Sequence, residues 1–203
     1  MSRVYLGVDA GNSKTVALAC FSSGQIVGAG RSGCGDIYGV AEPADAVVAV
    51  LDAVDEALSG AGVDRAAVAG AAFRLAGVDW PEDEAFWAKV LDTEWPSLLQ
   101  RSISNDGYAA IRCGEPSGAG VAVVAGTAAA VAARSRAGVE WDMSWWSQHS
   151  MGALGLVDEA FRAVFLAELD AAPATGLTAA LLEFFGQPSV AELNHWLTRR
   201  EGG

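Results

Sequence analysis

The sequence contains few cysteines and few histidines, and this shortage argues against two kinds of site. Cys20, Cys34 and Cys113 are odd in number and show no Cys-x-x-Cys spacing, so neither a disulfide framework nor a zinc site is expected. Three unpaired cysteines fit a reducing, cytoplasmic environment. His149 and His195 lie far apart in the chain and give no reason to predict a metal site.

Long apolar runs are also missing. The first residues, MSRVYLGVDAG, lack the apolar core of a signal peptide. The most apolar stretch, residues 118–133, is shorter than the ~20 residues that a membrane helix needs. Its central Gly-Thr is more typical of a turn between two buried strands. We therefore expect a soluble protein without a membrane partner.

Positive charge is scarce, with 13 Lys and Arg against 25 Asp and Glu, a net charge of -12. Such a chain repels a phosphate backbone, which argues against nucleic acid as a partner. A small nucleotide is still allowed, because backbone amides and a magnesium ion can hold its phosphates. With 52% hydrophobic residues over 203 positions, the composition indicates one large globular domain or two small ones.

The segment GVDAGNSKT, residues 7–15, resembles a phosphate-binding P-loop but does not have its pattern. That motif needs a glycine directly before the lysine and another five residues earlier, and this chain has Ser13 and Val8 there. The following residues, TVALACF, are apolar and partly β-branched, which favours a strand over a helix. The segment therefore predicts a β-hairpin, with strands at 4–8 and 14–21.

A hairpin tip of this composition can still bind an anion. Gly11, Asn12 and Ser13 could direct backbone N–H groups and small polar side chains at one phosphate. Asp9, at the end of the first strand, would suit a magnesium ion held through water. An ordinary surface hairpin with an incidental Lys14 explains the residues equally well, and both interpretations stay open at this point.

The rest of the chain alternates between strand and helix patterns and predicts an α/β protein. A third strand at about 25–31 completes a meander with the hairpin. A helix at 43–62 starts with proline and carries Val47, Leu51, Val54 and Leu58 on one stripe. The later predicted elements are a strand at 68–75, a helix at 81–95, a strand at 101–106, a short helix, and a second strand–turn–strand unit from about 120 to 134.

This second hairpin repeats the chemistry of the first. Its turn is Gly126-Thr127, again a glycine with a small hydroxyl residue. Two such tips facing one another could hold phosphates from both sides, with Asp106 near the cleft at the end of a strand. Asp106 also precedes the helical residues GYAAI, and from the residues alone a helix N-cap is the favoured interpretation.

Four segments together resemble the BadF/BadG/BcrA/BcrD-type ATPases, which include N-acetylglucosamine kinases, in the actin/hexokinase superfamily. The resemblance covers nearly the whole chain and implies a ribonuclease-H-like lobe at residues 1–115. A partial second lobe of the same type, C-terminally incomplete, would follow at 116–203. The segment PSVAEL also matches a helix start of bacterial members. The four segments are GVDAGNSKT at 7–15, LAGVDWPED at 75–83, SNDGYAA at 104–110 and GVAVVAGTAAAVAAR at 120–134.

The same resemblance implies ATP and Mg²⁺ as cofactors and assigns roles to individual residues. Asp9 would organise magnesium, and Asp106 would take the proton from the attacking sugar hydroxyl. The first phosphate loop would be Gly11, Asn12, Ser13, Lys14 and Thr15, the second Gly126 and Thr127, and the acceptor cleft would be lined by Asp36, Gly77, Asp79 and Asn105.

Several residues depart from the family pattern. Asp36 replaces an asparagine, so an acceptor-only carboxylate stands where members have an amide. Ala128 follows Thr127 where many members have glycine, and its side chain would approach the phosphates. The segment with Trp145, Trp146, Gln148 and His149 replaces a glycine-rich stretch, and a structural tryptophan cluster explains it best.

Two functions of different classes follow. The first is an ATP-dependent phosphotransferase acting on a small molecule, an amino sugar such as N-acetylglucosamine, or a related ATPase. The second is a degenerate, non-catalytic member that uses the fold for ligand binding or assembly. Asp9, Lys14, Asp106 and Thr127 favour the first. The altered tryptophan segment and the missing glycine-rich adenosine segment favour the second. Cys34 and Cys113 do not match a shared iron–sulfur cluster. A homodimer stays open.

Overall fold

The computed structural model describes residues 3–143, 146 and 151–199. The chain forms two compact units, Met1–Gln148 and His149–Gly203. The first unit contains both β-sheets and all the predicted site residues, and the second is helical.

The first unit is built on a mixed five-stranded sheet in the order β3-β2-β1-β4-β5. The first three strands form the antiparallel meander predicted from the sequence, whereas β4 and β5 pair in parallel with β1 and β4. Parallel neighbours need a crossover connection, which α1 and α2 supply. The predicted α/β class is confirmed. The elements are β1 (Val4–Ala10), β2 (Thr15–Phe21), β3 (Ile26–Ser32), α1 (Pro43–Ala61), a 3₁₀ turn at Arg65–Ala67, β4 (Val68–Leu75), α2 (Pro81–Glu94) and β5 (Arg101–Ser104).

One face of this sheet forms the core. Alternate residues of β1 are buried, and the intervening ones, including Asp9, are more exposed, as the two-residue period of a strand requires. The buried side packs with Val54 and Leu58 of α1 and Trp87 of α2. Asp9 therefore emerges on the face of the sheet opposite this core.

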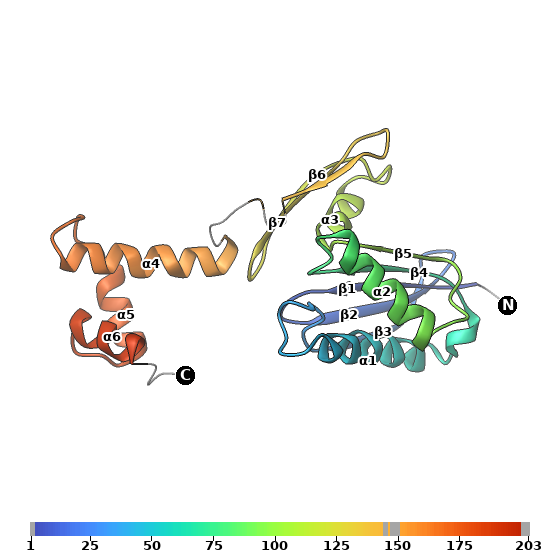
Figure 1. Ribbon diagram of the computed structural model, residues 1–203, viewed down its shortest axis with the longest axis horizontal. Coiled ribbons are helices and arrows are strands. Elements are labelled where there is room, and N and C mark those ends of the chain that lie inside the picture. The colour runs from blue at the N-terminus through green and yellow to red at the C-terminus, as the bar shows by residue number, and fades with distance from the viewer. Residues whose placement is uncertain (1–2, 144–145, 147–150, 200–203) are drawn as a thin grey trace. The chain divides into compact units, whose positions relative to one another are not determined.

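Helix α1 runs along β3 (Figure 1) at unusually close range. A Cβ atom on Gly28 or Gly30 would collide with the backbone of α1 at Ala57 or Ala53. The buried stripe predicted for this helix is only partly right. Alanines and Val50 join Val54 and Leu58 in the buried stripe, and Val47 and Leu51 lie at its flank.

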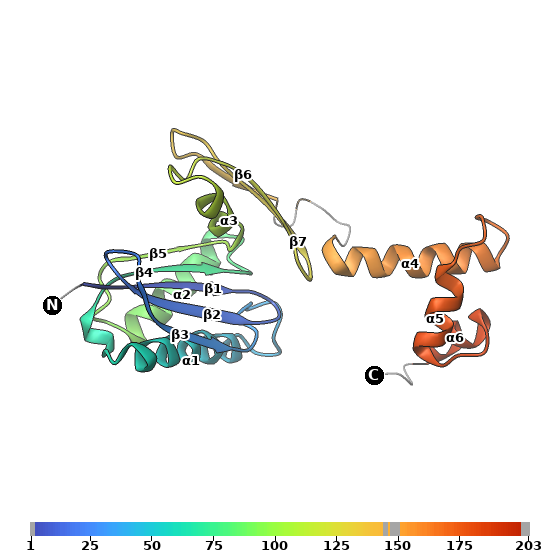
Figure 2. The ribbon, with the colours of Figure 1, turned by 180° about the vertical axis from the view of Figure 1, so that it is seen from behind.

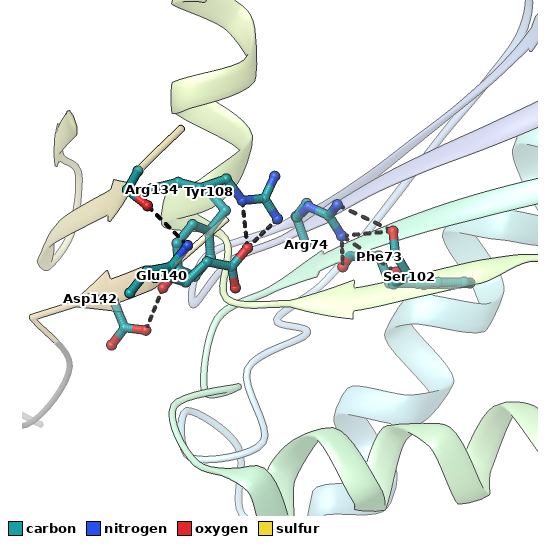
Figure 3. A network of polar contacts seen from close by, with 9 residues as sticks. Phe73, Arg74, Ser102, Tyr108, Arg134, Glu140 and Asp142 are labelled. Carbon is teal, nitrogen blue, oxygen red and sulfur yellow. Dashed lines mark hydrogen bonds and ion pairs between the residues drawn. The ribbon is translucent and has the colours of Figure 1, made fainter. Parts of the chain in front are cut away.

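A second sheet follows within the same unit. It is an antiparallel meander, and its first two strands are the predicted second hairpin. Helix α3 packs against this hairpin (Figure 2), where Tyr108, Ile111 and Ala132 are buried together. The Tyr108 hydroxyl donates a hydrogen bond to Asp142, and Arg134 pairs with Glu140 (Figure 3). The elements are α3 (Gly107–Gly114), β6 (Gly120–Ala125), β7 (Ala129–Arg134) and β8 (Glu140–Asp142).

The second unit contains α4 (Gly152–Glu168), α5 (Leu177–Phe185) and α6 (Val190–Thr198). Rings of Phe161, Phe185 and Trp196 pack together between the helices. Ser189 caps α6 by accepting the N–H of Glu192, which confirms the predicted helix start. Over the described ranges, no helix is both long and apolar enough to span a membrane.

Candidate active site

The loops after β1, β3, β4 and β5 enclose a pocket of about 360 Å³ together with the β6–β7 hairpin. Its size falls in the range of small-molecule sites, about 300–1,000 Å³. The carboxyl ends of β1, β4 and β5 lie at one edge of the sheet because these strands are parallel. The predicted residues that line the pocket are Asn12, Asp36, Gly77, Asp79, Asn105, Asp106, Gly126 and Thr127.

The tips of the two predicted phosphate loops meet beside this pocket. Ser13 Oγ lies 2.9 Å from Thr127 Oγ1, although the residues are 114 positions apart in the chain. Both hydroxyls are exposed, so an incoming anion could reach them. Ala128 lies on the pocket wall, and its carbonyl accepts the Gly126 N–H.

Not every N–H of the first tip is available for a ligand. The Gly11 N–H donates to the Lys14 carbonyl at 2.9 Å, which closes the turn. Within the described structure, the N–H groups of Asn12 and Ser13 make no hydrogen bond to another backbone group. The anion-binding capacity of the loop therefore rests on these two amides, the hydroxyls and the exposed Lys14.

Thr15 does not line the pocket. Its side chain is fully buried, and its hydroxyl donates to the Gly33 carbonyl at 3.0 Å. The reason is register, because Thr15 pairs with Ala10 and shares its inward direction. Gly35 packs directly on the Thr15 hydroxyl, so Thr15 fastens the β1–β2 turn to the segment after β3.

Asp106 is a strongly perturbed carboxyl in the pocket. Burial, followed by the negative charges of Asp9, Asp79 and Asp36, raises its pKa to about 6. Its side chain makes no helix-capping hydrogen bond. The side chain of Asn105 accepts the Gly107 N–H at 2.9 Å. Asp106 therefore occupies the N-cap position of α3 without the side-chain hydrogen bond that a cap would make.

Asp9 lies in a different environment. It is exposed at the end of β1, where desolvation raises its pKa and the charge of Lys14 opposes that rise. Among the residues placed by the structure, no three His, Cys, Asp or Glu side chains gather as a ready-made metal site. A single accessible carboxylate fits magnesium, which is commonly held by one or two carboxylates, waters and substrate phosphates.

The wall of the pocket formed by the loops after β3, β4 and β5 is a set of interlocked polar groups. Asp36 is buried, and it accepts hydrogen bonds from Asn12 Nδ2 at 3.2 Å and from the Tyr38 N–H at 2.9 Å. Asn105 Nδ2 donates to Asp79 Oδ1 at 2.8 Å. Gly77 has a φ of 73°, and a Cβ there would collide with the Asp36 carboxylate. The close approach of Gly77 to Asp36 holds the loop after β3, which carries Asp36, against the loop after β4, which carries Gly77.

Three polar residues at the site were not predicted from the sequence. Tyr38 and Asp142 line the pocket, and Asp83 hydrogen-bonds the Tyr38 hydroxyl from behind. The sequence does place Asp83 in the first turn of α2, where an acidic residue stands out. The helix dipole already explains an acidic residue there, so its position gave no reason to predict a role in the site. Of the tryptophan segment, Trp145, Gln148 and His149 lie outside the described residues, and Trp146 is exposed.

The chain belongs to the BadF/BadG/BcrA/BcrD ATPase family, whose sequence model matches residues 6–170. The match includes both hairpins, the pocket and α4. No curated protein matches the chain.

Several solved structures share the fold, two of them proposed N-acetylglucosamine kinases. A proposed N-acetylglucosamine kinase from Chromobacterium violaceum superposes with a TM-score of 0.74 at 24% identity, over 98% of this chain and 69% of that one. A proposed N-acetylglucosamine kinase from Porphyromonas gingivalis gives 0.63 at 20% identity, over 92% of this chain and 64% of that one. This chain therefore spans about two thirds of the length of either protein.

Proposed function

We propose that the chain forms the catalytic part of an ATP-dependent phosphotransferase, with an amino sugar such as N-acetylglucosamine as acceptor. The observation that carries the proposal is the meeting of the Ser13 and Thr127 hydroxyls beside a pocket that contains Asp106. In this proposal residues 1–115 form a ribonuclease-H-like lobe, and residues 116–203 form part of a second lobe.

The two hairpin tips would hold the nucleotide phosphates. Asn12 and Ser13 offer backbone amides, Ser13 and Thr127 offer hydroxyls, and Lys14 offers the nearby positive charge. Asp9 would orient a magnesium ion through water, and the bound ion would neutralise charge on the transferring phosphoryl group. Gly11 and Thr15 would shape the first loop without touching the ligand.

Asp106 would act as the general base. The acceptor hydroxyl gives its proton to the Asp106 carboxylate while its oxygen bonds to the γ-phosphorus. The bond between the γ-phosphorus and the β–γ bridging oxygen breaks, and ADP leaves with the electron pair of that bond. A base with a pKa near 6 is ionised at neutral pH and is still basic enough to accept the proton.

The acceptor would lie against the carboxylates and amide of the loops that follow β3, β4 and β5. Asp79 and Asn105 present hydrogen-bonding groups there, and Asp36 presents buried carboxylate oxygens. Carboxylates accept hydrogen bonds from sugar hydroxyls and from an N-acetyl N–H. This chemistry suits a neutral, hydroxyl-rich acceptor and disfavours an anionic one.

The test is ADP release from the purified chain against a panel of sugars and amino sugars, beside an Asp106→Asn variant. We expect turnover with an amino sugar, and a loss of about 10²-fold or more in kcat for Asp106→Asn with the KM for ATP nearly unchanged. Asp52→Asn, an exposed carboxylate on α1, is the matched control and should keep wild-type turnover.

Each other outcome has a clear meaning. Wild-type turnover in Asp106→Asn would falsify its role as the base. A chain that binds nucleotide but transfers phosphate to no acceptor would contradict the phosphotransferase proposal and favour a binding or assembly function.

A further inference from the structure

We infer that Asp83 is a positioning residue that holds together the two loops forming the acceptor side of the pocket. One loop follows β3 and carries Asp36 and Tyr38, and the other follows β4 and carries Gly77 and Asp79. This inference rests on the proposed function for its consequence in catalysis, but the link between the loops can be measured without any activity.

The contacts of Asp83 reach both loops at once. Its side chain is buried, with a relative exposure of 5%. Oδ1 accepts the Tyr38 hydroxyl at 2.8 Å, which joins Asp83 to the first loop. Oδ2 accepts the N–H groups of Asp79 at 3.1 Å and Trp80 at 2.9 Å, which joins it to the second. A single carboxylate therefore ties a side chain of one loop to the backbone of the other.

The position of Asp83 explains why a buried charge is stable there. A carboxylate in the first turn of α2 is favoured by the helix dipole, and its three hydrogen-bond donors offset the cost of burial. The hydrogen bond to Asp83, followed by burial, raises the pKa of Tyr38 to about 12, so the phenol stays a donor at neutral pH.

The link extends to the proposed base through the second loop. Asp83 holds the backbone N–H of Asp79, and the Asp79 carboxylate accepts Asn105 Nδ2 at 2.8 Å. Asn105 directly precedes Asp106 and accepts the N–H that starts α3. If the Tyr38–Asp83 bond is lost, the two loops can separate. Asp79 and Asn105 keep their bond to each other, but Asp36 and Tyr38 are no longer held at a fixed distance from them.

A second contact between the loops makes their separation measurable. Gly77 packs directly on the Asp36 carboxylate. That packing depends on the two loops staying at their present distance, which the bond between Tyr38 and Asp83 maintains. The amides of residues 77–80 should therefore exchange slowly in the wild type and faster once the bond is cut.

The experiment compares three variants. Tyr38→Phe removes only the hydroxyl, so it cuts the bond and leaves the start of α2 intact. Asp83→Ala removes both links. Asp83→Asn can keep both, since its amide oxygen accepts the backbone N–H groups and its NH₂ donates to the phenol. Glu82→Ala, an exposed carboxylate in the same helical turn, controls for the helix dipole.

We expect Tyr38→Phe and Asp83→Ala to speed hydrogen exchange at residues 77–80 by about 3-fold or more, as loss of a hydrogen bond predicts. The KM for the acceptor should rise by about 3- to 30-fold, with the KM for ATP within about 2-fold. Asp83→Asn should lie closer to wild type than to Asp83→Ala, and Glu82→Ala should match wild type. The double variant Tyr38→Phe/Asp83→Ala should resemble Asp83→Ala, because Asp83→Ala already breaks the only link that Tyr38→Phe removes.

Unchanged exchange at residues 77–80 in Tyr38→Phe would overturn the inference. So would an acceptor KM equal to wild type in a variant whose exchange is faster. If the parent chain transfers phosphate to no acceptor, the proposed function fails, and the exchange data alone then decide whether Asp83 links the loops.

Discussion

At the scale of single residues, the site separates its carboxylates by environment. Asp106 is largely buried and surrounded by other acids, and its pKa rises to about 6. Asp9 is the more exposed of the two; desolvation raises its pKa as well, but the positive charge of Lys14 opposes that rise. The buried group is therefore suited to exchange a proton, and the exposed one to hold a cation. Residue type alone does not make this distinction.

The raised pKa of Asp106 predicts that the stability of the protein depends on pH. Because the native state binds this proton more tightly than the unfolded state, ionisation lowers stability as the pH rises from about 4 to about 6. Asp106→Asn should therefore increase the free energy of unfolding at pH 7 by roughly 1–3 kcal/mol, with the difference disappearing near pH 4. Urea unfolding at pH 4, 5, 6 and 7 measures this, and an equal difference at every pH would contradict it.

The same titration should control catalysis. A general base works only when ionised, so kcat/KM for the acceptor should fall as the pH drops below about 6. The residual activity of Asp106→Asn should lack this decrease. A wild-type profile that is flat between pH 5 and 8, measured with a fixed excess of magnesium and ATP, would show that Asp106 is not the titrating group.

At the scale of elements, the sequence predicts which strands pair better than it predicts which way each side chain points. The hairpin at Gly11–Ser13 follows from its turn residues and from the strand pattern that flanks them. The inward direction of Thr15 follows only from its pairing with Ala10. Asp83 and Tyr38 are 45 positions apart, and no local pattern joins them. Local chemistry therefore locates the two hairpin turns, whereas the polar wall that carries Asp36 and Asp79 depends on tertiary contacts.

The packing of α1 on β3 gives a prediction at this scale. Gly30→Ala would place a methyl group against the Ala53 carbonyl in the core, and the helix would have to move. We expect a loss of about 2 kcal/mol or more in unfolding free energy, as for other overpacked cores. Gly7→Ala in β1 is the matched control, because nothing lies within 4 Å of its added Cβ. Equal stability of the two variants would contradict the close packing.

At the scale of the whole molecule, the net charge of -12 opposes any anionic ligand, so a phosphate site must be local. The first unit meets this requirement by folding two distant hairpins to one point, where Ser13 and Thr127 touch. Neither tip alone supplies many donors, since the Gly11 and Gly126 amides are used within their own turns. Binding should therefore involve both hairpins together.

This convergence predicts the response of the chain to nucleotide. Saturating magnesium–nucleotide should slow hydrogen exchange at residues 11–15 and 126–128 with the same concentration dependence, because both tips would contact the same phosphates. The helices α5 and α6 should not respond. Removing magnesium with a chelator should weaken both effects in parallel, since Asp9 would then face the phosphates without a cation between them. Thr127→Val, which keeps the side-chain shape and removes the hydroxyl, should weaken the protection at residues 11–15 as well as at its own loop. Protection of one tip without the other would show that the two hairpins do not form a common phosphate site.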